Sequence, residues 1–244
     1  MTKKIAIMQP YLFPYIGYWQ LMNAVDTFVS YDDVNYINRG WINRNNILSN
    51  GAPRLITLSL EKASQNKLIN EINICTEHKN RASFLQMIYT SYKKAPFFAK
   101  VYPIIEDVML NPEKNIAKFI FASFVKIADY LGIRTELLVS SEIDKDNSLK
   151  GDDKISHMCQ ILNATHYINP IGGMAIYDPY KFSSKNIDLS FIKTDFSRIF
   201  YRQFNNDFIN GLSIIDVMMF NSVQQVKEIL SFFDLVRKDG NVAD

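Results

Sequence analysis

The sequence predicts an α/β fold with a mostly parallel, doubly wound sheet, and three observations support this prediction. Short, continuous apolar runs recur along the chain, as is typical of strands that are buried on both faces of a parallel sheet. The first two runs, residues 4–8 and 27–31, are separated by a helical pattern, which is the spacing of a β-α-β unit. Later apolar runs alternate with longer stretches of helical periodicity.

The first unit starts with the strand expected at residues 4–8. The chain then passes through "QPYLFPYIGY", a turn rich in proline and tyrosine, before a short helix. The apolar face of this helix is the set Trp19, Leu21, Met22 and Val25. The second strand, residues 27–31, ends at two adjacent acidic residues.

The middle of the chain should form a long loop, a third strand and a set of helices. Residues 35–53 are mostly polar, with turn signals at Arg39-Gly40 and Asn50-Gly51, and the strand is expected at 54–60. Helical periodicity then covers residues 80–94, 97–110 and 114–131.

The remaining pattern completes the sheet. Strands are expected at 135–140, at 165–173 and at 187–193, with a helix at 151–164 between the first two. One or two helices should close the chain over 212–233. These elements predict a single domain, residues 1–244, with a Rossmann-like, mostly parallel doubly wound sheet and a helical insertion at about 80–131.

Composition argues against several functions. Lys and Arg number 27 against 25 Asp and Glu, so there is no electrostatic basis for binding DNA, RNA or an anionic membrane. No apolar run is long enough for membrane insertion, and no secretory signal precedes the first strand. With only two cysteines, we expect a cytoplasmic protein with reduced thiols. The 13 tyrosines predict a half-hydrated cleft in addition to an aromatic core.

Ligands of open α/β sheets bind at the carboxyl ends of the strands. Four unusual segments fall at such strand ends, namely residues 9–18, 32–44, 169–177 and 201–216. The sequence therefore predicts that these segments gather in one ligand-binding cleft.

The first segment favours a nucleotide-like ligand. Gly17 allows close backbone approach where a helix begins, and the free N–H groups there suit a phosphate. The layout "FPYIGY" resembles the P-x-H-x-G-H turn of nucleotidyltransferases, with Tyr15 and Tyr18 in place of the histidines. Tyrosine can hold a ligand oxygen but offers no imidazolium to a leaving pyrophosphate, which weakens the case for adenylate transfer. The alternative is a structural turn with packed rings.

The second segment supplies candidate catalytic and stacking groups. Asp32 and Asp33 could bind a metal, act as a general base or cap a turn. Neighbouring side chains of an extended chain point to opposite sides, and we favour Asp33 as the one that faces a ligand. Trp41 is suited to stack on a base or sugar ring, and Arg44 to pair with a phosphate or carboxylate. The alternative is a solvated surface loop.

The remaining segments add weaker candidates. Gly172 and Gly173 form a tight turn or approach a ligand, and Ser213 is either a helix N-cap or a phosphate contact. His157 and Cys159 lie two residues apart on a helix and do not face each other, so a buried, inert thiol is expected. The histidines show no metal-ligand spacing, and we expect no metal site.

Taken together, these blocks resemble the WbqC-like family over almost the whole chain. The matching blocks are "QPYLFPYIGYWQLM", "DTFVSYDDVNYINRGWINRN", "YKKAPFF", "YINPIGGMAIYD" and "LSIID" followed by "FN". The resemblance implies a role in bacterial surface-polysaccharide biosynthesis, in particular of the lipopolysaccharide O-antigen. The positions that match the family's blocks are Gln9, Tyr11, Pro14, Gly17, Asp32, Asp33, Trp41, Asn43, Arg44, Gly172, Gly173, Tyr177, Gln203, Ser213 and Asp216.

The resemblance leads us to expect a transferase that moves an acyl or aminoacyl group, such as glycyl, to the amine of a nucleotide-linked deoxyamino sugar. Asp33 or Asp32 would take the proton of the attacking amine. Two alternatives stay open: an ATP-using, magnesium-dependent ligase or nucleotidyltransferase-like enzyme, and a non-catalytic subunit that binds a nucleotide-sugar. The acyl donor, any further cofactor and the oligomeric state, a homodimer included, also stay open.

Overall fold

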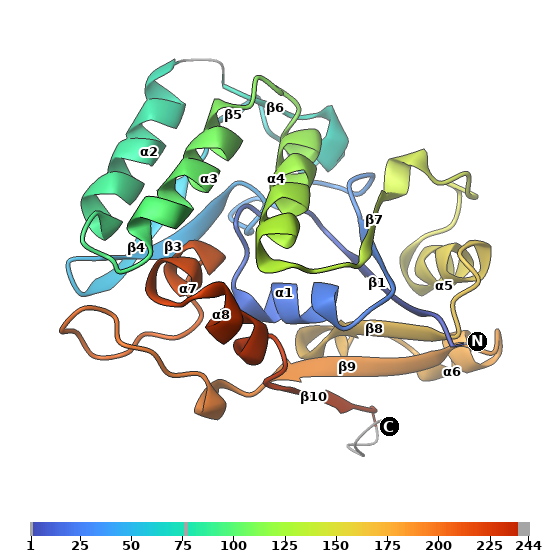
Figure 1. Ribbon diagram of the computed structural model, residues 1–244. Coiled ribbons are helices and arrows are strands. Elements are labelled where there is room, and N and C mark those ends of the chain that lie inside the picture. Colours follow the sequence, from blue (N-terminus) through green and yellow to red (C-terminus); the bar gives the residue numbers. More distant parts are fainter. Residues whose placement is uncertain (1, 76–77, 239–244) are drawn as a thin grey trace.

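The apolar run at the start of the chain forms β1 (Lys4–Met8), a central strand of a six-stranded sheet (Figure 1). We describe residues 2–75 and 78–238 of a computed structural model. The other strands of this sheet are β2 (Thr27–Ser30), β7 (Glu136–Val139), β8 (His166–Pro170), β9 (Asp188–Thr194) and β10 (Phe233–Val236). Their order is β10-β9-β8-β1-β2-β7, and all neighbours are parallel except β10, which is antiparallel to β9. The predicted α/β class with a mostly parallel sheet is confirmed.

Helices cover both faces of the sheet, which explains why its strands are continuously apolar. Ala6 belongs to a core that includes α1 (Ile16–Asn23) and α4 (Ile116–Leu131). Its neighbours Ile5 and Ile7 face the other way, into a second core. The helices of that second core are α5 (Gly151–Ile161) and α6 (Pro179–Ser183). Because β2 and β7 lie on one side of β1 and β8 and β9 on the other, the direction of the strand order reverses beside β1.

Two hairpins and a layer of helices are inserted between β2 and β7 (Figure 1). The hairpins pair β3 (Arg44–Ser49) with β4 (Ala52–Thr57) and β5 (Leu60–Glu61) with β6 (Asn73–Ile74). The helices are α2 (His78–Tyr92), α3 (Phe98–Leu110) and α4, and they pack against one another in chain order. The three helices expected in this region are therefore confirmed. Among the described helices, none has the length and apolarity needed to cross a membrane.

Two regions differ from the sequence prediction. Residues 35–53 were expected to be loop, but 44–49 form β3, because the expected Asn50-Gly51 turn folds them back onto β4. Both turn residues have positive φ angles, 51° and 75°. The C-terminal helical pattern divides into α7 (Ile214–Phe220) and α8 (Val223–Ile229), after which the chain forms the unpredicted strand β10. Short 3-10 turns complete the fold at Ile69–Glu71, Ser140–Glu142, Ile171–Gly173 and Phe196–Arg198.

Gly17 is required by close packing between α1 and β9. A Cβ atom at this position would lie 2.5 Å from Thr194 Oγ1 and 2.5 Å from the ring of Tyr15. The Thr194 hydroxyl cannot easily move away, because it donates a hydrogen bond of 2.7 Å to the buried amide of Gln20.

We predict that Gly17→Ala lowers the free energy of unfolding. Overpacking of about 1–3 kcal/mol should outweigh the gain of about 1 kcal/mol from the higher helix propensity of alanine. Urea unfolding measures the difference. The matched control is Gly172→Ala, where a Cβ atom meets nothing within 4 Å and the change should stay within about 0.5 kcal/mol. Equal stability of the Gly17→Ala variant and the wild type would contradict the packing argument.

Candidate functional site

Three of the four segments expected to form one cleft contribute to two pockets along the carboxyl edge of the sheet, whereas residues 169–177 line neither of them. Residues that follow β2 and β7 line the first, and residues that follow β1 and β9 line part of the second. Several other candidate residues line neither pocket and are buried in the core. The prediction of one shared cleft is therefore replaced by two separate sites.

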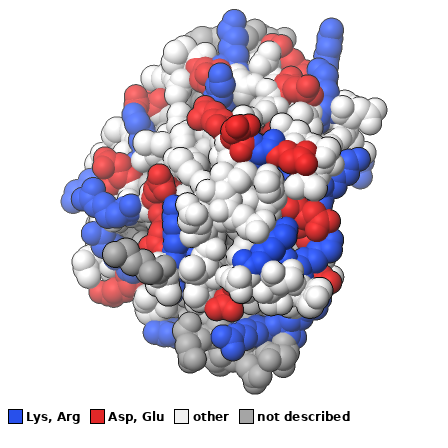
Figure 2. All heavy atoms as spheres, turned by 90° about the vertical axis from the view of Figure 1, so that its right-hand side faces the viewer, with Lys and Arg blue, Asp and Glu red and all other residues white. Residues whose placement is uncertain are grey.

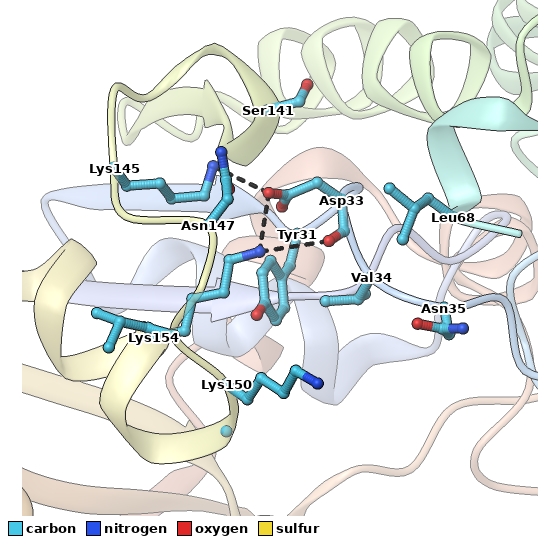
Figure 3. A pocket seen from close by; sticks show the side chains of 12 residues that line it. Tyr31, Asp33, Val34, Asn35, Leu68, Ser141, Lys145, Asn147, Lys150 and Lys154 are labelled. Carbon is cyan, nitrogen blue, oxygen red and sulfur yellow. Dashed lines mark hydrogen bonds and ion pairs between the residues drawn. The ribbon is translucent and has the colours of Figure 1, made fainter.

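The first pocket, here called the lysine pocket, is a cavity of about 590 Å³ at the ends of β2 and β7 (Figure 3). One side of the pocket is formed by the chain after β2, and the other side by the loop that leads from β7 into α5. The lining residues are Tyr31, Asp33, Val34, Asn35, Leu68, Ser141, Lys145, Asn147, Leu149, Lys150, Gly151 and Lys154.

The carboxylate of Asp33 lies between two buried lysines. Its Oδ2 atom is 2.9 Å from Nζ of Lys145 and 3.0 Å from Nζ of Lys154. These residues are only 9% and 7% exposed. The hydroxyl of Ser140 donates a hydrogen bond to the other oxygen of Asp33. Asp33, Lys145 and Lys154 together carry one net positive charge, and the buried carboxylate of Asp32 lies 3.4 Å from the same Ser140 hydroxyl.

The surroundings of Asp33 keep it ionised. Burial acts to raise its pKa, but the hydrogen bonds from Ser140, Lys145 and Lys154 outweigh this effect and hold the pKa below its usual value. Burial raises the pKa of the neighbouring Tyr31, and the negative charge of Asp33 raises it further. The pocket therefore presents a carboxylate, ammonium groups and a neutral phenol.

Asp32 does not line the lysine pocket but holds the chain after β7, and its Oδ1 atom lies 3.4 Å from the Ser140 hydroxyl that also contacts Asp33. Its carboxylate accepts hydrogen bonds from the backbone N–H of Ser141 at 2.9 Å and from the Ser141 hydroxyl at 2.7 Å. It is almost completely buried. The two adjacent carboxylates thus divide as expected, with Asp33 on the side of the pocket, and Asp32 positions the turn that precedes Lys145.

Sequence reasoning missed both lysines. For Lys154 a signal existed, because it lies one helical turn before Met158 on the apolar face of α5, where an unpaired lysine would not be tolerated. Lys145 lies in an irregular loop, and nothing in its sequence neighbourhood indicates that it is buried.

The second pocket, here called the aromatic pocket, has a volume of about 360 Å³. Its lining residues are Tyr11, Pro14, Tyr15, Trp41, Asn45, Phe196, Asn210 and Gly211. Three of the expected ligand-binding residues, Tyr11, Pro14 and Trp41, therefore share one site. Arg44 lies beside it with its guanidinium over the Trp41 ring, and its Nε and Nη2 atoms donate to the carbonyl oxygens of Gly40 and Arg39.

The two helix starts expected to hold phosphate are buried instead. At the start of α1, Gly17 is packed against β9, and the Tyr18 hydroxyl donates to the carbonyl oxygen of Gln9 at 2.8 Å within the core. At the start of α7, the Ser213 hydroxyl donates to the Phe13 carbonyl oxygen and accepts from the backbone N–H of Ile215. Ser213 is thus an N-cap, the first of the two roles considered for it.

Asn43 and the residues after β8 also have structural contacts. The Asn43 amide donates to the Leu58 carbonyl oxygen and accepts from the Tyr36 hydroxyl. Gly173 is buried against Asn169, and Tyr177 accepts a hydrogen bond of 3.3 Å from Tyr167. Of the glycine pair, only Gly172 has open space around it.

Cys159 is buried, and burial raises its pKa to about 12, so the expected inert thiol is confirmed.

Charged side chains elsewhere are mixed in sign. Figure 2 shows one face of the molecule, on which acidic and basic residues are interspersed around a largely uncharged centre. Within residues 2–75 and 78–238, no group of three or more His, Cys, Asp or Glu side chains is arranged to hold a metal ion.

Asp216 is the centre of a buried network rather than a ligand contact. Its carboxylate accepts hydrogen bonds from Tyr92 at 2.9 Å, Tyr201 at 2.8 Å and Gln203 at 2.7 Å. Burial raises the pKa of Asp216 and the three hydrogen bonds lower it; the effect of burial is larger, and the pKa is raised to about 6. The folded protein therefore binds this proton more tightly than the unfolded chain does.

We predict that Asp216 makes stability depend on pH. Its contribution should be fully present below about pH 4 and should be lost as the pH rises through about 6. Relative to Asp216→Asn, the wild type should lose on the order of 3 kcal/mol of unfolding free energy across this range. Urea unfolding at a series of pH values measures the slope. The exposed Asp207→Asn variant should keep the slope of the wild type, and a wild-type slope in Asp216→Asn would contradict the raised pKa.

Comparisons with known proteins identify the family. The model of the WbqC-like protein family matches residues 9–228. The chain is also 26% identical over 232 residues to the uncharacterized protein Rv1507c of Mycobacterium tuberculosis (strain ATCC 25618 / H37Rv), with 94% of this chain and 98% of that protein covered. No solved structure gave a significant match. The family model covers most of the chain, including both pockets and the Asp216 network, and the protein belongs to the WbqC-like family.

Proposed function

We propose that this protein is a transferase of bacterial surface-polysaccharide biosynthesis, acting in O-antigen assembly. It moves an acyl or aminoacyl group, such as glycyl, to the amine of a nucleotide-linked deoxyamino sugar. Membership of the WbqC-like family supports the pathway, and the reversal of strand order beside β1 in a mostly parallel sheet supports the nucleotide-linked substrate. The observation that carries the chemistry is the pair of buried lysines on the Asp33 carboxylate.

The lysine pocket fits an anionic substrate that also carries an amine. The excess positive charge of Lys145 and Lys154 attracts a phosphate group. The same charge disfavours protonation of a bound amine, so the amine is kept in its nucleophilic form. A nucleotide-linked amino sugar combines both groups, and the cavity of about 590 Å³ is large enough for the sugar and a phosphate.

Asp33 is placed to accept the proton of the amine. The amine nitrogen attacks the carbonyl carbon of the acyl donor, a C–N bond forms, and the bond to the leaving group breaks with its electron pair departing on that group. Once the C–N bond has formed, the nitrogen is an acidic ammonium, so a carboxylate with a lowered pKa can still take its proton. Before the leaving group departs, the charge of the lysines stabilises the negative charge on the carbonyl oxygen of the tetrahedral intermediate.

We predict that Asp33→Asn abolishes transfer while nucleotide-sugar binding is retained. Loss of the proton acceptor should lower kcat by about a hundred- to ten-thousand-fold, and the added positive charge should keep or improve affinity. Mass spectrometry of a panel of nucleotide-linked deoxyamino sugars, incubated with thioester and aminoacyl donors, measures turnover. Calorimetry measures binding. The exposed Asp144→Asn variant, in the same pocket-forming loop, is the matched control.

Because Asp33→Asn leaves two lysines uncompensated, a second variant keeps the charge balance. The double variant Asp33→Asn/Lys145→Met removes one anion and one cation together, and it should also be inactive while folded by circular dichroism. Full activity in either folded variant would remove Asp33 from the mechanism. Thermal protection by Mg-ATP, with none by nucleotide-sugars, would favour an ATP-using ligase instead.

We further predict that Lys154→Met weakens nucleotide-sugar binding, because Asp33 would then be balanced by Lys145 alone and the excess positive charge would be lost. The affinity should fall by at least about tenfold, the size of one charge-assisted hydrogen bond. Lys150→Met, at the exposed rim of the same pocket, should have a smaller effect. A larger loss in Lys150→Met than in Lys154→Met would contradict the assigned role of the buried pair.

A further inference from the structure

The aromatic pocket has a chemistry opposite to that of the lysine pocket. None of its eight lining residues is charged, and five of them present an aromatic or proline ring. The lining residues themselves offer no charge to balance a phosphate. A flat, uncharged group would find ring faces on which to stack.

Trp41 is the residue that most needs an explanation. It is 43% exposed at the edge of this cavity, although an indole is costly to leave in water. The guanidinium of Arg44 lies over its ring, 5.8 Å from the centroid, and is itself held by two backbone carbonyl oxygens. The exposed ring is thus fixed before any ligand arrives, which reduces the entropy that stacking would cost.

Two tyrosine hydroxyls are available at the same cavity. Tyr11 and Tyr15 are largely buried, and within the described chain neither hydroxyl has a hydrogen-bond partner. Burial raises the pKa of both residues, so each stays a neutral donor and acceptor. By contrast, the side-chain NH2 group of Asn45 already donates hydrogen bonds to the carbonyl oxygens of Leu12 and Phe13. Stacking faces with free hydroxyls at their edge match a heterocycle that carries polar groups on its rim.

We propose that the aromatic pocket binds the uncharged base of a nucleotide, stacked on Trp41 and hydrogen-bonded at its edge by Tyr11 and Tyr15. The inference goes beyond the proposed function and does not depend on it, because the aromatic pocket and the lysine pocket share no lining residue. The ring site itself depends on the cavity of about 360 Å³, the fixed indole and the free hydroxyls.

Free nucleosides test the ring site without the lysine pocket, because they carry no phosphate. Thymidine, uridine and adenosine are titrated into the full chain into the millimolar range, and tryptophan fluorescence is followed. Since Trp19 is completely buried, a saturable change reports on Trp41. Trp41→Ala should weaken nucleoside binding at least about fivefold, the lower end for loss of one stacked base. Because this variant lacks the reporter, calorimetry measures its affinity.

Two further variants complete the experiment. Tyr11→Phe/Tyr15→Phe removes only the hydroxyls and should lower nucleoside affinity while the fold is kept. Tyr180→Ala removes an exposed ring outside the pocket and should leave affinity unchanged. The inference is overturned if no nucleoside binds, if Trp41→Ala binds as tightly as the wild type, or if methyl glycosides bind at Trp41 and nucleosides do not. Each of these results can occur while nucleotide-sugars are still turned over, so failure here is distinct from failure of the proposed transferase.

Discussion

The lysine pocket exists because one carboxylate compensates two buried ammonium groups. Removing a lysine from water costs several kcal/mol unless its charge is balanced. Lys145 follows β7 and Lys154 lies in α5, and both meet Oδ2 of Asp33 at the end of β2. The adjacent Asp32 fixes the turn from which Lys145 departs. Two neighbouring acidic residues thus hold together the chain segments that form the pocket: Asp33 binds the two lysines, and Asp32 binds the turn before Lys145.

The fold was largely predictable because its elements have strong, local patterns. The strand β1 is buried on both faces, and only an apolar run such as "KIAIM" tolerates this. The helices of the insertion were found from their periodicity. In β3, by contrast, "RNNILS" has no strict alternation, and its pairing with β4 depends on tertiary contacts. The strand β10 has four residues and continues a helical pattern, so no local signal separated it from the helix.

The candidate site was less predictable, because polar residues near strand ends look alike whether they bind ligands or one another. Asp33 was found from its place after β2. Asp216 and Gln203 were chosen for the same kind of reason, yet they satisfy each other inside the core. Only the hydrogen-bond partners distinguish the two cases, and these come from distant parts of the chain. For the same reason Lys145 was missed, because its partners, Asp33 and the carbonyl oxygens of Ser140 and Ile143, are known only from the structure.

The turn after β1 is held by buried polar residues, and its conformation places two tyrosines at the aromatic pocket. Phe13, between them, has a φ angle of 44°, which is unfavourable for a bulky residue. Its carbonyl oxygen accepts hydrogen bonds from Asn45 at 2.7 Å and from Ser213 at 2.8 Å, and these contacts hold the strained conformation. The turn consequently sends Tyr18 into the core while Tyr11 and Tyr15 line the aromatic pocket. Asn45 and Ser213 therefore shape the aromatic pocket by fixing the backbone, so substitutions there should affect the pocket through Tyr11 and Tyr15.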